Sequence, residues 1–308
     1  MGNKVLIIGL GSIGKRHAQV LKKLGCSLSV LSQHGNSSDL IIFKDLQTAL
    51  SRHPDYIIIA NETENHYQTL VSLASVDYQG KILVEKPLFH TSEIALNPFK
   101  NITSKIYVGY VMRFHNLIQR AKEWLEGQKI YSINCYCGQF LPTWRPNTDY
   151  RRSYSAQKPG GGVLRDLSHE LDYLQFLTGE WQSVVATQGH LTNLEIDTED
   201  ISSFLLKTER CENIVCQLNY WDHNVQRYCI INSEKGTCTL DFISNTLTIN
   251  QKTDSCSQER NQMFQEMHIN VLTKNGKNVA SFYDSLSVLS LINGIEKSYH
   301  TRKWIQRK

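Results

Sequence analysis

The chain has 308 residues, a length that predicts two domains rather than one ordinary hydrophobic core. Apolar residues make up 41% of the sequence and charged residues 20%, so the composition is that of a globular protein and excludes a disordered or fibrous one. The formal net charge of +4 is modest, and we therefore expect neither a nucleic-acid nor a membrane partner.

The cysteines and the hydropathy of the chain bear on its location. The eight cysteines contain no C-x-x-C pair and no metal-ligand spacing, so we expect no metal site and interpret them as reduced thiols. No apolar run approaches the roughly 20 residues that a membrane helix needs. Both features predict a soluble, cytoplasmic protein.

Residues 1–118 alternate strands and helices in the manner of βαβ units. The predicted strands are 4–9, 28–31, 56–60, 81–84 and 105–109, and the predicted helices are 12–24, 46–52 and 66–75. These strands are continuously apolar, which is typical of a parallel sheet that helices cover on both faces. We expect an α/β first domain with a doubly wound parallel sheet.

A glycine motif opens the first predicted helix. Gly9, Gly11 and Gly14 directly follow a predicted strand, and this context distinguishes a dinucleotide-binding G-x-G-x-x-G from a chance match. The first glycine permits the tight turn, the second lets the backbone approach a pyrophosphate, and the third allows close helix–strand packing. The helix start, with Ser12 and Ile13, offers free N–H groups to the phosphates. The motif predicts a Rossmann domain.

The end of the second predicted strand bears on the choice of cofactor. NAD sites usually have an acid there, about 20 residues after the glycines, that binds the ribose 2′-hydroxyl. In this chain the position is occupied by Ser32, and no acid occurs before Asp39. No arginine that could bind a 2′-phosphate replaces the acid. The cofactor is therefore NAD or NADP, with a slight preference for NADP.

Lys86 follows another predicted strand, within the sequence Glu85-Lys86-Pro87. In an open α/β sheet, the carboxyl ends of the strands border the crevice in which ligands bind. The proline also restricts the preceding lysine to extended conformations. Lys86 is thus a candidate site residue, and an ordinary surface lysine is the alternative interpretation.

The pattern changes after a linking helix predicted at 114–126. Short strands follow, at 129–140, 182–191, 201–207, 213–221, 226–232, 237–242 and 246–250. They predict an α+β second domain over residues 119–308, with a large, mainly antiparallel sheet. Residues 253–265 are polar and are predicted to be a loop, residues 281–300 form a helix, and the basic tail is a solvated terminus.

A helix with two different faces is predicted over residues 160–179. Its apolar residues fall within one sector of about 100°. They are Val163, Leu164, Leu167, Leu171 and Leu174. The opposite side carries Arg165, Asp166, His169 and Asp172, with an acid about 60° to either side of the histidine.

The segment before this helix is rich in arginine and aromatic residues. They are Trp144, Arg145, Tyr150, Arg151, Arg152 and Tyr154. Guanidinium groups bind phosphate or carboxylate, and flat rings cover the faces of sugars. The segment suits an anionic, sugar-bearing ligand, and a positively charged surface loop is the alternative interpretation.

Several of these motifs, in their order along the chain, resemble the glucose–fructose oxidoreductase/inositol dehydrogenase (Gfo/Idh/MocA) family. The resemblance covers nearly the full length and rests on residues 9–17, 60–66, 85–87, 109–114 and 160–179. It implies a cofactor site that includes Asn61, Thr63, His66, Glu85 and Lys86. In relatives the acid before the lysine lies near the nicotinamide ribose, and the peptide bond between the lysine and the proline is often cis.

The resemblance also implies a catalytic lysine and histidine, which are Lys86 and His169 here. Many relatives have an aspartate four residues before the histidine, but this chain has Arg165 there and Asp166 one residue later. Residues 144–156 look like those of members associated with nucleotide-sugar and surface-polysaccharide synthesis. The predicted substrate-binding residues are Arg113, Trp144, Arg145, Tyr150, Arg151, Arg152 and Arg165.

We therefore predict an NAD(P)-dependent oxidoreductase that acts on a secondary alcohol or ketone of a sugar, nucleotide sugar or cyclitol. His169 would be the general acid/base, since an unperturbed histidine pKa of ~6.5 suits both directions near neutrality. Lys86 would polarise the reacting oxygen, and Asp166 or Asp172 would orient the imidazole or bind substrate hydroxyls. The resemblance implies a homodimer or homotetramer that associates through the C-terminal sheet.

Three other functions fit the same motifs. One is a redox-neutral epimerase or glycosidase that reduces and reoxidises its cofactor within one cycle. Another is a non-catalytic nucleotide-binding regulator on the same fold, although such proteins tend to lose catalytic side chains. The third is a reductase of an unsaturated or imine substrate, for which the sugar-suited segment is poor support. The dehydrogenase is preferred to all three.

Overall fold

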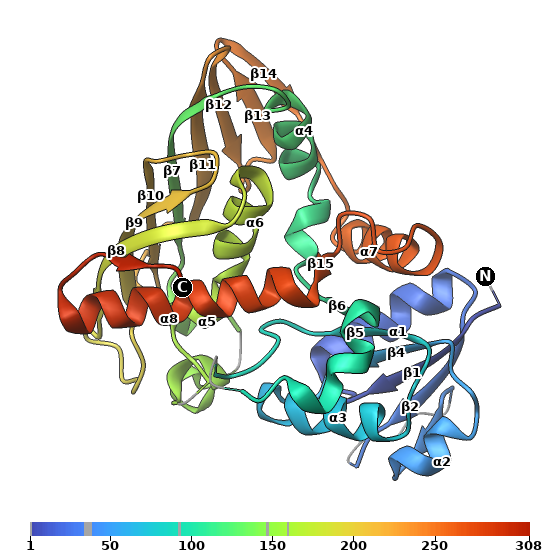
Figure 1. Ribbon diagram of the computed structural model, residues 1–308. Helices are drawn as coiled ribbons and strands as arrows, with labels where there is room; N and C mark the ends of the chain where they lie inside the picture. Colours follow the sequence, from blue (N-terminus) through green and yellow to red (C-terminus); the bar gives the residue numbers. More distant parts are fainter. Residues whose placement is uncertain (1, 34–38, 92–93, 146–147, 159) are drawn as a thin grey trace. The chain divides into compact units, whose positions relative to one another are not determined.

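The computed structural model describes the residues of the chain except 1, 34–38, 92–93, 146–147 and 159. The chain forms two compact units, and each unit is assembled from two segments (Figure 1). The first unit contains Met1–Phe114 and Glu259–Leu286, and the second contains His115–Gln258 and Ser287–Lys308. The sequence predicted two domains, each a single uninterrupted segment, at residues 1–118 and 119–308. It did not predict that the chain returns to the first unit at Glu259.

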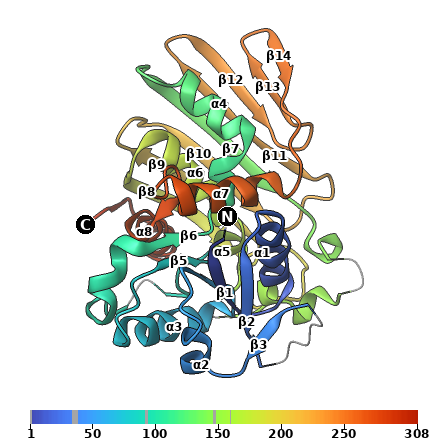
Figure 2. The same cartoon turned by 90° about the vertical axis from the view of Figure 1, so that its right-hand side faces the viewer.

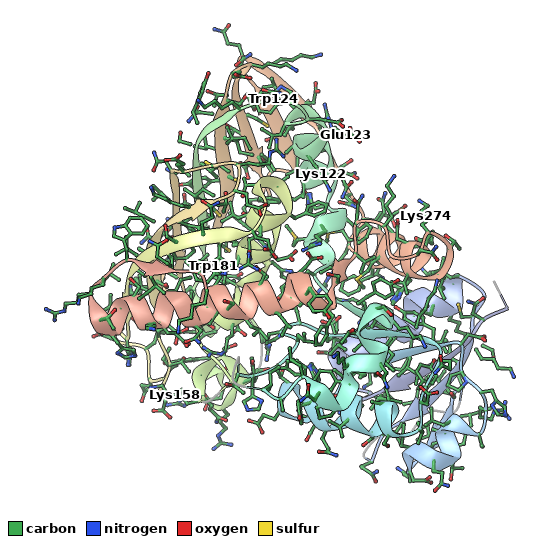
Figure 3. All side chains as sticks on the ribbon, in the orientation of Figure 1. Lys122, Glu123, Trp124, Lys158, Trp181 and Lys274 are labelled. Carbon is green, nitrogen blue, oxygen red and sulfur yellow. The ribbon has the colours of Figure 1, made fainter. Side chains whose placement is uncertain are left out.

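Helix α7 (Gln262–Thr273) gives the physical reason for this return. Its side chains Phe264, Met267 and Val271 are buried in the hydrophobic core of the first unit. The last turn of the helix, before the C-cap residue Lys274 (Figure 3), accepts a hydrogen bond from the sheet. There the ammonium group of Lys81 donates to the carbonyl oxygen of Val271. The segment therefore completes the first unit.

The sheet of the first unit is parallel except at one edge. Its strands are β1 (Lys4–Ile8), β2 (Ser27–Leu31), β3 (Ile41–Phe43), β4 (Tyr56–Ile59), β5 (Lys81–Val84), β6 (Ile106–Val108) and β15 (Ala280–Ser281). Their order is β15-β6-β5-β4-β1-β2-β3, and only β15 is antiparallel to its neighbour. The order reverses at β1, the position at which open α/β sheets bind ligands. The expected Rossmann fold is confirmed.

Helices cover both faces of this sheet (Figure 1). They are α1 (Ser12–Lys23), α2 (Leu46–Leu50), α3 (Thr63–Ser75) and α7, with the 3₁₀ segments η1 (Asn97–Lys105) and η2 (Val111–Phe114). Helix α1 packs beside α7, and α3 packs beside η1. Because both faces are covered, strand residues such as Leu6 and Ile7 are fully buried.

The second unit contains a nine-stranded sheet of order β14-β13-β12-β11-β7-β10-β9-β8-β16. Its strands are β7 (Ile130–Gly138), β8 (Trp181–Gly189), β9 (Ile201–Thr208), β10 (Ile214–Asn219), β11 (Gln226–Ser233), β12 (Gly236–Asp241), β13 (Thr246–Ile249), β14 (Lys252–Ser255) and β16 (Ile305–Gln306). Strands β7 and β10 pair in parallel and the other pairs are antiparallel. This confirms the expected mainly antiparallel sheet.

One face of this sheet packs against helices α4 (Asn116–Trp124), α5 (Val163–Asp166) and α6 (Ser168–Thr178) (Figure 2). At the β8 end, Trp181 packs against Gly294 of α8 (Phe282–Thr301), where a Cβ atom would lie 2.9 Å from the indole ring (Figure 3). Alternation along β10 buries Cys216 and leaves Val215 42% exposed. The opposite face therefore presents apolar side chains to solvent.

The single helix expected over residues 160–179 is in fact the pair α5 and α6. Leu167 separates them with a ψ angle of 24°, which lies outside the α-helical range. The expectation of one continuous helix is therefore wrong. The predicted angle of about 60° between Asp166 and His169 is also wrong, because the two residues lie in different helices.

The residues of α6 also do not divide into a buried and an exposed face. The expected apolar stripe is buried, but Glu170 and Asp172 are 0% exposed as well. Burial of Glu170 is possible because Arg227 donates a hydrogen bond to its carboxylate at 2.6 Å. A charged residue on this helix can therefore be buried, because an arginine of the distant strand β11 pairs with Glu170.

The chain beyond residue 250 differs from expectation in two places. The loop predicted at 253–265 contains most of β14 and the start of α7. Strand β14 has no apolar alternation because it is an exposed edge strand, held to β13 by backbone bonds and by a Thr248–Thr253 hydroxyl contact of 2.9 Å. The tail expected to be solvated contributes β16, which pairs with β8. Among the described residues, none of the helices combines the length and apolar character that a membrane span requires.

Candidate active site

The glycine turn after β1 has the geometry of a phosphate-binding loop. Gly9 has a φ angle of 97°, and a Cβ atom there would lie 2.6 Å from the carbonyl oxygen of Ala60. A Cβ atom at Gly14 would lie 2.1 Å from the carbonyl oxygen of Gly9, so packing requires both glycines. A Cβ atom at Gly11 would meet no described atom within 4 Å. The protein thus leaves the space in front of Gly11 open.

The start of α1, directly behind this open space, suits an anion. Gly11 is the N-cap, and the N-cap gives the helix no side-chain hydrogen bond. The first turn, which includes Ser12 and Ile13, contains no acidic residue. Its N–H groups and the positive end of the helix dipole can therefore bind phosphate oxygens. These observations fit a dinucleotide pyrophosphate.

Lys44 lies beside Ser32 at the end of β2 and was not identified from the sequence. Its ammonium group donates to the carbonyl oxygens of Ser32 at 3.1 Å and Gln33 at 2.9 Å. The side chain of Gln33 in turn donates to the carbonyl oxygen of Lys44 at 2.6 Å. The expectation from the sequence considered only an arginine near Ser32, whereas this cation is a lysine that directly follows β3.

His66 connects the loops that follow β4 and β5. Nε2 lies 3.2 Å from the carbonyl oxygen of Asn61, and Nδ1 lies 3.2 Å from those of Pro87 and Leu88. The ring is 1% exposed, and this burial lowers its pKa although the nearby carbonyl oxygens act in the opposite direction. The buried His66 ring thus joins the two loops through these contacts. Thr63 is the first residue of α3.

Glu85 and Lys86 occupy the carboxyl end of β5. The carboxylate of Glu85 accepts a hydrogen bond from the backbone N–H of Lys86 at 3.3 Å, and its Oε1 lies 2.9 Å from Nε2 of His17. A Cβ atom at Gly109 would lie 2.6 Å from that same oxygen, so the glycine provides the space for the carboxylate. The Lys86–Pro87 peptide bond is cis, as the resemblance implied.

Both predicted substrate-binding arginines outside residues 144–156 are engaged in ion pairs. Arg113 is 5% exposed and its guanidinium donates to Asp284 at 3.2 Å. Arg165 donates to Glu296 of α8 at 2.6 Å. Both contacts join residues more than 100 positions apart in the chain, so neither could be predicted from local sequence patterns.

Asp166, at the end of α5, accepts a hydrogen bond from Tyr220. The hydroxyl of Tyr220 lies 2.7 Å from Oδ2 of Asp166. Burial, and then the charge of Asp166, raises the pKa of Tyr220 well above its usual value, so the hydroxyl stays protonated and donates. His169 lies in the first turn of α6 and is half-buried, whereas Asp172 is fully buried. Tyr220 was not predicted from the sequence.

A small, partly open pocket lies within the arginine- and aromatic-rich segment. It is lined by Leu141, Trp144, Arg145, Thr148, Tyr150, Ser153 and Ser155. The ring of Trp144 packs edge-on against Tyr220 at 5.4 Å. One wall of the pocket is therefore in contact with the tyrosine that holds Asp166.

The arginines of this segment differ in their availability. Arg151 binds both carboxylate oxygens of Asp149, at 2.8 and 3.0 Å, and also lies 3.3 Å from Glu195. These acids raise the pKa of Arg151 and compensate its charge. Arg145 and Arg152 are exposed, and neither forms an ion pair with a described residue. Arg145 lines the pocket, so it is the cation best placed to bind an anionic ligand there.

Comparisons with known proteins bear on both units. Residues 3–100 match the GFO/IDH/MocA oxidoreductase family with an NAD-binding Rossmann fold, and residues 118–239 match the GFO/IDH/MocA C-terminal domain. Levoglucosan dehydrogenase from Pseudarthrobacter phenanthrenivorans is 28% identical over 141 residues. That match spans 43% of this chain and 36% of the relative, about a third of its length.

Solved structures share the whole fold at low sequence identity. The WlbA dehydrogenase from Bordetella pertussis, in complex with NADH and UDP-GlcNAcA, is 17% identical with a TM-score of 0.81, covering 100% of this chain and 98% of that one. An oxidoreductase from Agrobacterium radiobacter, in complex with NAD+, L-tartaric acid and magnesium, is 16% identical with a TM-score of 0.86, covering 99% and 98%. Identity this low shows the fold alone.

Proposed function

Because the chain belongs to the Gfo/Idh/MocA oxidoreductase family, we propose that it is a dinucleotide-dependent dehydrogenase acting on a secondary alcohol or ketone of a sugar-type substrate. The observation that carries this proposal is the open space at Gly11 in front of the uncapped start of α1. This space would accommodate a phosphate group at the sheet position where Rossmann folds bind dinucleotides. The bound nicotinamide ring would accept or donate the hydride.

We also assign the chemical roles to individual side chains. Lys86 would bind the reacting oxygen and stabilise charge on it, and His169 would take or give the hydroxyl proton. Asp166, which Tyr220 holds in place, would bind substrate hydroxyls or orient His169. Asp172 is fully buried and would serve only to orient. If His169→Ala or Lys86→Met left turnover within a few-fold of wild type, this assignment would be wrong.

We propose that the protein accepts NADP(H) as well as NAD(H). The family domain is NAD-binding. Two observations support acceptance of a 2′-phosphate as well: no acid follows β2 before Asp39, and the ammonium group of Lys44 lies at Ser32. Lys44→Met should weaken NADPH binding about tenfold and leave NADH binding within about twofold, because one phosphate–ammonium contact is lost. Equal effects on both cofactors would argue against this role of Lys44.

We propose that the substrate carries a phosphate or carboxylate group as well as hydroxyl groups. Support comes from Arg145 in a pocket whose wall includes Trp144 and Tyr150. A structural neighbour, WlbA, is named with the acidic nucleotide sugar UDP-GlcNAcA, and a relative is named for levoglucosan, a neutral sugar. The charged pocket favours the first kind of substrate, although free sugars and cyclitols remain in the panel to be tested.

A two-step experiment tests the function. Native mass spectrometry of the purified protein identifies a retained dinucleotide, and a panel of sugars, cyclitols and nucleotide sugars is then assayed for NAD(P)H formation. Substrate-dependent formation of NAD(P)H supports the dehydrogenase. A sugar that changes without net formation of NAD(P)H would instead identify an epimerase or glycosidase, and cofactor binding with no reaction across the panel would identify a regulator.

Two further proposals concern assembly and location. We propose that the chain forms a homodimer or homotetramer through the open face of the nine-stranded sheet, where Leu205 and Val215 are exposed on adjacent strands. Light scattering of wild type and a Val215→Lys variant would test it. All eight cysteines are free, which supports a cytoplasmic location.

A further inference from the structure

Four polar side chains of the first unit form a continuous hydrogen-bonded chain that ends on Glu85. The hydroxyl of Tyr56 in β4 lies 3.1 Å from Nδ1 of His268 in α7. Nε2 of that histidine lies 2.9 Å from Nδ1 of His17 in α1, and Nε2 of His17 lies 2.9 Å from Oε1 of Glu85. Tyr56, His268 and His17 are all 0% exposed. Residues from three distant elements thus act on one carboxylate.

The positions of the hydrogens in this chain follow from its buried end. A buried phenol hydroxyl needs an acceptor, and among the described residues Tyr56 finds it in Nδ1 of His268. That histidine then carries its hydrogen on Nε2 and donates to His17. His17 accepts at Nδ1 and donates from Nε2 to Oε1 of Glu85. Burial, and then His17, lowers the pKa of His268 well below its usual value, in agreement with a neutral ring.

Ring packing fixes the two imidazoles. His17 packs edge-on against His268 at 5.0 Å and against Phe264 at 5.5 Å, and His268 packs edge-on against Tyr56 at 5.8 Å. Phe264 and His268 both come from α7. The returning segment thus supplies a polar contact to the cofactor unit in addition to its apolar core residues.

Glu85 is held on both oxygens yet lies at the surface of the unit. Oε1 faces His17, Oε2 accepts from the backbone N–H of Lys86, and Gly109 provides the space for the carboxylate. The side chain is 12% exposed. An acceptor fixed in this way loses little freedom when a ligand hydroxyl donates to it, which increases affinity.

We propose that His17, His268 and Tyr56 are positioning residues of the dinucleotide site, which keep Glu85 oriented to accept a hydrogen bond from a hydroxyl group of the dinucleotide. This inference rests on the proposed dinucleotide-dependent function. If the four groups were merely structural, each would need a hydrogen-bond partner. Loss of the hydrogen that His268 donates would then not change the affinity for the cofactor.

The first measurement determines where the hydrogens lie. The full-length protein is labelled with ¹⁵N in its histidine rings, and the signals of His17 and His268 are assigned by comparison with variants at each position. We expect two neutral rings, each protonated on Nε2 only. A hydrogen on Nδ1 of either ring, or a doubly protonated His17 at neutral pH, would overturn the proposed direction of the chain.

The second measurement compares two double variants by NADH titration. His268→Gln with Tyr56→Phe keeps an N–H donor near the former Nε2 and leaves no unsatisfied hydroxyl. His268→Leu with Tyr56→Phe removes the donor to His17. We expect the leucine variant to raise the Kd for NADH about tenfold, the effect of losing one hydrogen bond that supports a charged acceptor. The glutamine variant should stay within about twofold of wild type.

Val271→Ala is the matched control, since it removes buried apolar atoms from the same helix without touching the hydrogen-bonded chain. Melting temperatures of all three variants separate loss of fold from loss of affinity. Equal Kd values for the leucine and glutamine variants, or an equal loss in Val271→Ala, would overturn the positioning role. Failure of the wild type to bind NADH or NADPH would instead overturn the dinucleotide function, and this inference with it.

Discussion

Gly11 and Gly14 belong to one turn but differ in what surrounds their Cα atoms. A methyl group at Gly14 would lie 2.1 Å from the carbonyl oxygen of Gly9, whereas one at Gly11 would meet no described atom within 4 Å. We expect Gly14→Ala to destabilise the protein by about 3 kcal/mol or more, since backbone must move. Gly11→Ala should leave the melting temperature unchanged and weaken NADH binding about tenfold, because the methyl group enters the space assigned to the pyrophosphate.

Thermal denaturation and NADH titration of the two variants measure these effects separately. Unchanged NADH affinity in Gly11→Ala would place the pyrophosphate elsewhere.

Removal of the Tyr220 hydroxyl group tests the proposed role of Asp166. Tyr220→Phe removes the hydrogen bond to Asp166, while the ring keeps its contact with Trp144. We expect kcat to fall about tenfold with a small change in stability, because a misplaced carboxylate acts on the chemical step. Steady-state kinetics on the substrate found in the panel would measure it.

Tyr173→Phe is the matched control for this substitution. Tyr173 is equally buried in the second unit, but its hydroxyl lies 3.1 Å from the sulfur of Cys135 rather than near Asp166. Equal losses of kcat in both variants would mean that Tyr220 acts through the fold alone.

The residues of the site differ in how far the sequence could predict them. The glycine turn was predictable because its parts are local and directly follow a strand. The Asp149–Arg151 pair was not predicted, although its members are only two residues apart. Tyr220 was not predictable, because its contact with Asp166 spans 54 positions and a buried tyrosine has no distinct local pattern. The same holds for His17 and His268, which are 251 positions apart.

At the scale of elements, the buried pair between α6 and β11 should dominate the pH dependence of stability. Burial raises the pKa of Glu170, and Arg227 counteracts this effect. Arg227→Met would leave an isolated buried carboxylate, which costs about 3–5 kcal/mol when it is ionised. A carboxyl whose folded pKa is raised gives stability that is present at low pH and is lost as the pH rises through that pKa.

We therefore expect the loss in Arg227→Met to be larger at pH 8 than at pH 5, where the carboxyl of Glu170 can bind a proton. Denaturant unfolding at the two pH values measures it. The double variant with Glu170→Gln serves as the control, and its loss should not change with pH in this range. A pH-independent loss in the single variant would mean that Glu170 is already neutral there.

Elements were predictable where one periodicity extended over the whole segment. The buried strands β1, β4 and β5 have continuous apolar runs and were predicted within a residue. Helix α7 was not predicted, because residues 253–265 are mostly polar and were interpreted as a loop. Phe264, Met267 and Val271 nevertheless have the apolar spacing of three and four residues that is typical of a helix. The break at Leu167 could not be predicted, since neither glycine nor proline marks it.

At the scale of the whole molecule, the first unit consists of two segments that are far apart in the sequence. The chain leaves that unit after Phe114 and returns at Glu259. The two crossing points lie close together, because the backbone N–H of Asn116 donates to the side chain of Gln258 at 2.9 Å. A short linker can therefore join the two segments without strain.

This closeness gives a test of which residues are needed to bind the cofactor. A chain of residues 1–114, a short Gly/Ser linker and residues 259–286 retains the core contacts of Phe264, Met267 and Val271. We expect it to fold and to bind NADH, whereas residues 1–114 alone should expose the apolar surface that α7 covers and fail to fold cooperatively. Circular dichroism melting and NADH titration of the two fragments would show the difference. Equal cooperative folding of both would mean that α7 is an accessory to the unit rather than part of its core.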